Sequence, residues 1–142
     1  MHHRQVRDVM AADPMTVTPA TPLKDVADIL ASRKVSAVPV LSIDGTLLGV
    51  VAGTDLAAKE QLRQDPDAPH WAQMSYRTRR AVATAETAGD LMRTHPVTVR
   101  ADTTVAEAAR LMDRHQASCL PVADERGKLL GIVGSRDLLR VL

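Results

Sequence analysis

The chain has 142 residues, of which 45% are hydrophobic and 25% charged, and its formal net charge is +1. This composition is typical of one globular unit and excludes a large multidomain enzyme, a disordered chain and a coiled coil. Phe is absent, with one Trp and one Tyr, so almost nothing is available to stack a flat ligand between aromatic rings.

The near-neutral charge gives no global field that would draw the chain onto nucleic acid. Cys119 is the only cysteine, which excludes an intrachain disulfide. The N-terminus does not resemble a signal peptide, and no stretch approaches the roughly 20 apolar residues of a membrane span. We therefore expect a cytoplasmic protein with no membrane segment.

The first predicted elements are a short strand and a helix. A strand is expected over residues 15–18, because the residue before Pro14 avoids the helical region and a β-branched run follows. Thr21 and Pro22 then favour a helix start. Apolar residues recur at helical spacing from Leu23 to Leu30, which indicates one buried face.

A hairpin and a second helix follow. The apolar runs 37–41 and 47–51 flank Asp44-Gly45, a strong turn signal. Pro39 should lie at a strand start or on an edge strand, since it cannot donate to a central ladder. Asp55 suits the free amides of a helix that begins near Thr54. The predicted unit is β-α-β-β-α.

The whole unit occurs twice, offset by 82 residues. Seventeen positions of the first half carry the same residue 82 positions later: 8, 10, 14, 16, 17, 21, 27, 36, 39, 40, 45, 47, 48, 49, 51, 55 and 56. Each copy is too small to be stable alone, so the two must pack on each other. We expect repeat 1 at 1–62, a linker at 63–86 and repeat 2 at 87–142, with two equivalent clefts about a pseudo-two-fold axis.

The repeated segments 35–40 with 44–56, and 117–122 with 127–138, resemble the cystathionine β-synthase (CBS) domain family. The resemblance implies an α/β (α+β) fold with two CBS repeats packed into one Bateman-type module. It also implies a homodimer that binds adenosine-containing ligands of the AMP, ADP, ATP, NAD or S-adenosylmethionine class.

The resemblance further implies that each cleft combines residues of both repeats. Cleft A would use Met15, Val35, Ser36, Ala37, Pro39, Ile132, Arg136 and Asp137. Cleft B would use Val97, Ala117, Ser118, Cys119, Pro121, Val50, Thr54 and Asp55. An Asp carboxylate can accept hydrogen bonds from both ribose hydroxyls, and aliphatic walls with strand amides can hold an adenine.

The chain departs from the family three residues before each Asp, where a Thr or Ser is usual and Ala52 and Gly134 stand instead. The missing hydroxyls weaken the expectation of phosphate binding. Thr54 offers a substitute in cleft B and Arg136 in cleft A, and we rank cleft A first for phosphorylated ligands.

Several of these residues also have a purely structural interpretation. Asp55 and Asp137 can be helix N-caps without a ligand. Gly49 and Gly131 can serve close strand packing. Cys119 lies in an apolar strand, where an inert buried thiol is expected.

No catalytic motif and no metal-ligand spacing is found in the sequence, so we expect no enzyme, no metal and no required cofactor. The leading hypothesis is a regulatory module that senses an adenosyl ligand and acts on an effector protein or fused domain. One alternative is a structural dimerisation module with empty clefts. Another, weaker one is nucleic-acid binding through the arginines of the linker.

The linker is the unrepeated part and holds both aromatic residues, Trp71 and Tyr76, and a basic run of Arg77, Arg79 and Arg80. The simpler interpretation is a connection whose aromatic residues pack against the module. The alternatives are a docking surface for a partner or a weak contact with nucleic acid.

Overall fold

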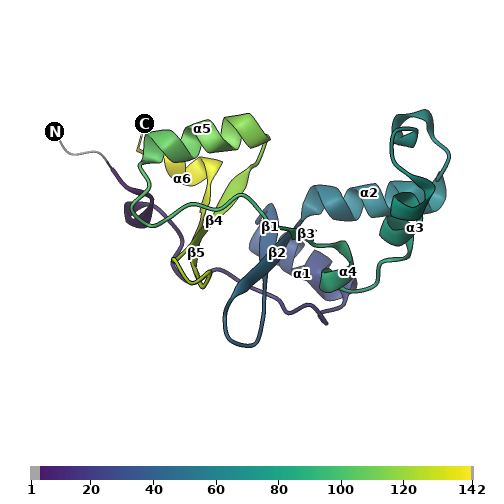
Figure 1. Cartoon of the computed structure of the whole chain (residues 1–142), viewed down its shortest axis with the longest axis horizontal. Helices are drawn as coiled ribbons and strands as arrows, with labels where there is room; N and C mark the ends of the chain where they lie inside the picture. Colours follow the sequence, from purple (N-terminus) through teal and green to yellow (C-terminus); the bar gives the residue numbers. More distant parts are fainter. Residues whose placement is uncertain (1–3, 142) are drawn as a thin grey trace.

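The structure is a computed structural model, and it describes residues 4–141. The first half contains α1 (Leu23–Arg33), β1 (Ala37–Leu41), β2 (Leu47–Ala52) and α2 (Gly53–Gln64). The second half repeats this order with α5 (Val105–His115), β4 (Cys119–Ala123), β5 (Leu129–Gly134) and α6 (Ser135–Leu139). The predicted mixed fold of two similar repeats is confirmed (Figure 1).

Each repeat is built around an antiparallel hairpin. Pro39 lies opposite Val50 in the pair β1-β2, and Pro121 lies opposite Ile132 in β4-β5. Both prolines are in strands at the end of their sheet, as expected for a residue that cannot donate to a ladder. The turns contain Gly45 at φ +87° and Gly127 at φ +82°, a region that favours glycine.

The strands expected over 15–18 and 97–99 are a correction, since each is reduced to one parallel bridge, Val17 to Val40 and Val99 to Val122. Val17 N donates to Pro39 O at 3.0 Å, and Leu41 N donates to Val17 O at 2.9 Å. Prolines at 14, 19 and 39 lack the N–H that a longer ladder would need.

The opening segment of each repeat packs on the other repeat. The 3-10 helix η1 (Val6–Asp8) places Val6 in the second hydrophobic core. Conversely, α4 (Ala88–Leu91) places Ala88 in the first core, and β3 (Arg93–Thr94) extends the first sheet to the order β1-β2-β3. Neither core is therefore confined to one repeat, although the division at 62 and 87 follows the repeated sequence.

Contacts across the pseudo-two-fold axis join residues that are related by the offset of 82. Leu47 N donates to Gly127 O at 2.9 Å, and Leu129 N donates to Gly45 O at 3.2 Å. Ser118 Oγ donates to Ser36 Oγ at 3.0 Å. These matched bonds place the two hairpin turns, and the starts of β1 and β4, side by side.

Asp44 adds an unmatched ion pair at this axis, with Lys128 Nζ 3.3 Å from its Oδ2. Hydrogen bonds from Ser42 and Thr46, together with Lys128, hold the pKa of the Asp44 carboxyl well below its usual range. The carboxylate therefore stays charged at neutral pH and links the turns of the two repeats.

The linker forms the 3-10 helix η2 (Pro69–Trp71) and α3 (Tyr76–Thr84), which lies beside α2 and projects away from the sheets (Figure 1). Trp71 is half-buried, whereas Tyr76 is 70% exposed, so the expectation that both aromatic residues pack holds only for the tryptophan. Arg79 is half-buried and donates to Pro66 O at 3.1 Å. Its guanidinium thus holds the linker in place. Within residues 4–141, no helix has the length and apolarity to cross a membrane.

Candidate functional site

A cavity of about 500 Å³ is lined by both repeats and by the crossed-over segment that contains β3. The end of β2 and the first turn of α2 form one side. The other side comes from the chain before β4 and from β4 itself. The lining residues are Ala37, Val50, Ala52, Thr54, Arg93, Thr94, His95, Pro96, Val97, His115, Gln116, Ala117, Ser118, Cys119, Leu120 and Pro121.

This cavity coincides with cleft B. Seven of the eight residues expected there line it: Val50, Thr54, Val97, Ala117, Ser118, Cys119 and Pro121. Asp55 does not line it, and Ala37, expected in cleft A, does. The lining is largely aliphatic, which suits a flat apolar group in the absence of aromatic rings.

Sequence reasoning missed the basic side chains of the cavity, Arg93, His95 and His115. The comparison of the repeats searched for identical residues, and these positions differ from their counterparts Ala11, Asp13 and Arg33. The signal that could have found them is the set of positions where the two repeats disagree within the predicted cleft.

Asp55 is buried at the third position of α2, not at its N-cap, which is Ala52. Ala52 N donates to its Oδ2 at 2.9 Å. Arg93 donates to its Oδ1 through Nε at 2.9 Å, and Nη2 of the same guanidinium lies 2.9 Å from that oxygen. The carboxylate thus closes the start of α2 and carries an ion pair with a residue of the other repeat.

Cys119 is half-buried in the cavity wall. Burial raises the pKa of its thiol, against the opposing effect of hydrogen bonds with Ser36 and Ser118. A protonated thiol is a poor nucleophile, which agrees with the expected inert cysteine.

The residues expected in cleft A are arranged on the same backbone plan. Asp137 is half-buried and accepts a hydrogen bond from Gly134 N at 2.8 Å. Ile132 and Ala11 exchange two backbone hydrogen bonds of 2.9 and 3.0 Å. Of the remaining residues, Met15, Val35, Ser36 and Arg136 are exposed, while Ala37 and Pro39 are buried in β1.

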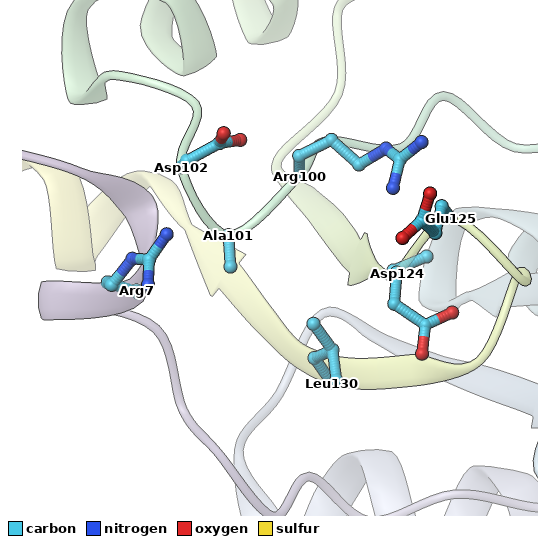
Figure 2. A pocket seen from close by; sticks show the side chains of 8 residues that line it. Arg7, Arg100, Ala101, Asp102, Asp124, Glu125 and Leu130 are labelled. Carbon is cyan, nitrogen blue, oxygen red and sulfur yellow. The ribbon is translucent and has the colours of Figure 1, made fainter.

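A second hollow of about 460 Å³ lies beside η1 and the β4-β5 hairpin, away from the predicted site residues (Figure 2). Arg7 and Arg100 face it together with the acidic residues Asp102, Asp124 and Glu125. The Asp124 carboxylate already accepts hydrogen bonds from the backbone of Arg126 and Lys128 at 2.9 and 3.0 Å. Because its charges are mixed and partly engaged, this hollow is not the candidate site.

In the described part of the chain, no three His, Cys, Asp or Glu side chains are grouped so that they could share a metal ion. The chemistry of the cavity is therefore that of aliphatic walls, backbone amides, hydroxyls and basic groups.

Known proteins match this chain along its length. The CBS domain family model matches residues 6–60 and 88–142. The chloroplastic CBS domain-containing protein CBSX2 of Arabidopsis thaliana is 31% identical over 134 residues, which cover 87% of this chain and 56% of that protein. The homoserine O-acetyltransferase of Methanococcoides burtonii is 25% identical over 99% of this chain, which spans only 24% of that enzyme.

Solved structures agree with this fold. The crystal structure of CBSX2 in complex with AMP superposes with a TM-score of 0.85 and 32% identity, covering 96% of this chain and 95% of that one. A CBS domain-containing protein from Thermotoga maritima gives a TM-score of 0.79 and 28% identity, covering 100% and 96%. Two family matches that coincide with the two structural repeats leave one conclusion: the chain belongs to the CBS domain family and carries two copies of the domain.

Proposed function

We propose that this CBS pair is a non-catalytic regulatory module that binds an adenosine-containing ligand in cleft B. The observation that carries the proposal is the cavity of about 500 Å³ lined by seven of the eight residues expected there. Its volume lies in the range of small-molecule sites. The similar structure of CBSX2, at 32% identity, holds AMP, which supports the ligand class.

The lining suits the parts of such a ligand. Val50, Val97 and Leu120 offer aliphatic surface for the base, while Thr54 and Ser118 offer hydroxyls. Arg93 and the two histidines provide cationic or donor groups for an anionic part. No further cofactor is needed for this role, because occupancy alone can bias the packing of the repeats and so the state of an effector protein or fused domain.

Isothermal titration of the chain with AMP, ADP, ATP, NAD and S-adenosylmethionine tests the proposal. We expect binding of at least one of them, and Ala117→Trp, which fills cleft B, should abolish it. The matched control is Val35→Trp, 82 residues earlier in cleft A, which should leave cleft B intact. No binding of any of these ligands at millimolar concentration would overturn the proposal, with circular dichroism showing that each variant is folded.

The alternative of a dimerisation module with empty clefts predicts silence in the same titrations. The homodimer itself remains part of our proposal, and analytical ultracentrifugation with and without AMP tests it. A cytoplasmic location is likewise proposed on the grounds of the sequence.

The nucleic-acid alternative is weakened by the linker. Arg79 is engaged with the Pro66 carbonyl, which leaves Arg77 and Arg80 as the exposed members of the basic run. Two exposed arginines give a small phosphate-binding surface, and we do not favour this function.

A further inference from the structure

The two clefts differ at the matched carboxylates. In cleft B, Asp55 Oδ2 accepts from Ala52 N, and Oδ1 accepts from Nε of Arg93 with Nη2 equally close, all at 2.9 Å. A carboxylate offers about four acceptor positions. Three are therefore taken, while both hydroxyls of a ribose would need two.

Cleft A has the same backbone without the cation. Arg93 pairs with Val50 in the sheet, and Ala11, 82 residues earlier, pairs with Ile132. Asp137 keeps the backbone hydrogen bond from Gly134 N at 2.8 Å. The difference between the two carboxylates is thus the exchange of one side chain, arginine in cleft B for alanine in cleft A.

The Arg93 side chain is placed so that it can move from Asp55 to a ligand. It is 72% exposed and lines the cavity, whereas the Asp55 side chain is 10% exposed. A neutral ribose hydroxyl competes poorly with a charge-assisted bond to the same oxygen. A phosphate, in contrast, offers the guanidinium a second anion that matches its planar fork.

We propose that Arg93 is the specificity-determining residue of cleft B: it occupies Asp55 in the ligand-free cleft and transfers to the phosphate when an adenosine 5′-phosphate binds. The transfer frees Asp55 for the ribose hydroxyls. Cleft B thereby selects phosphorylated adenosyl ligands over adenosine. The inference rests on the proposed function, and it reverses the ranking that put cleft A first because of Arg136.

Titration of AMP and adenosine against the wild type, Arg93→Ala and Arg93→Lys tests this assignment. Loss of the guanidinium should weaken AMP by roughly 10- to 100-fold, the size expected for charge-assisted hydrogen bonds. Adenosine should bind the Ala variant at least as tightly as the wild type, since Asp55 is then free. The Lys variant keeps the charge without the fork and should lie between the two. Arg63→Ala, an exposed arginine at the end of α2, is the matched control.

Alkylation of Cys119 assigns the binding to cleft B, because this sole thiol lies in its wall. AMP should slow the alkylation of the wild-type protein, and this protection should weaken in Arg93→Ala. Equal weakening of AMP and adenosine, or an unchanged preference for AMP in Arg93→Ala, would overturn the inference while leaving adenosyl binding intact. Binding of neither compound to the wild type would remove the proposed function and the inference together.

Discussion

Clefts A and B share their backbone contacts and differ in their side chains. Gly49 and Gly131 hold β3 and the Ala11 segment at close range, and Asp55 and Asp137 accept equivalent amides. Cleft B adds Arg93, His95 and His115, where cleft A has Ala11, Asp13 and Arg33. The duplicated architecture thus preserves what folds the module, while the residues that would face a ligand have diverged.

The largest effect is expected where the backbone plan itself is broken. An added Cβ at Gly49 would come within 2.7 Å of Arg93 O, and one at Gly131 within 2.5 Å of Ala11 O. Gly49→Ala and Gly131→Ala should each lower the free energy of unfolding by about 1 to 3 kcal/mol, measured by urea denaturation. Gly53→Ala is the control, because its Cβ would meet only Ser36 O, at 3.8 Å. Wild-type stability of both variants would show that the crossed-over segments are not held in this way.

The N-caps of α2 and α6 should respond unequally to the same substitution. Ala52 and Gly134 provide no side-chain cap, and alanine is the poorer N-cap of the two. Ala52→Ser should raise the free energy of unfolding by about 1 kcal/mol, whereas Gly134→Ser should gain only a few tenths. Thermal denaturation of the two variants, side by side, measures the difference. Equal gains would contradict it.

The ion pair that distinguishes cleft B should appear as an energetic coupling. In a double-mutant cycle of Arg93→Ala and Asp55→Asn, we expect about 0.5 to 1 kcal/mol, since Arg93 is largely exposed. The same arginine variant combined with Asp137→Asn should be additive. Chemical denaturation of the single and double variants gives both values, and additivity in the first cycle would rule out the pair as a feature of the folded state.

The smallest effect is expected from the pH dependence of Cys119. Burial raises the pKa of this thiol, so its alkylation should begin at higher pH than that of an unfolded cysteine. The folded thiol keeps its proton longer, so its contribution to stability is full below the unfolded pKa and is lost as the pH rises through the folded one. Stability profiles of the wild type and Cys119→Ala should therefore converge at alkaline pH. Rapid alkylation at neutral pH would contradict the raised pKa.

Local sequence signals were sufficient for the helices and hairpins. Glycine at the turns, the apolar spacing from Leu23 to Leu30 and the acidic residue at the start of α2 each act within a few residues. The offset of 82 also predicted the pairing of the repeats, and with the family resemblance it located most of cleft B. The expected first strands failed because proline removes donors on both sides of Val17, an effect that strand propensity does not include.

The sequence by itself determined the duplicated unit, its order of elements and the aliphatic character of the site, because these depend on short-range patterns. Only the tertiary structure decided that each opening segment crosses to the other repeat. That crossing brings Arg93 to Asp55, 38 residues away along the chain. Such a contact depends on how the segments pack, which no local pattern encodes, and it is the feature that makes two similar clefts chemically different.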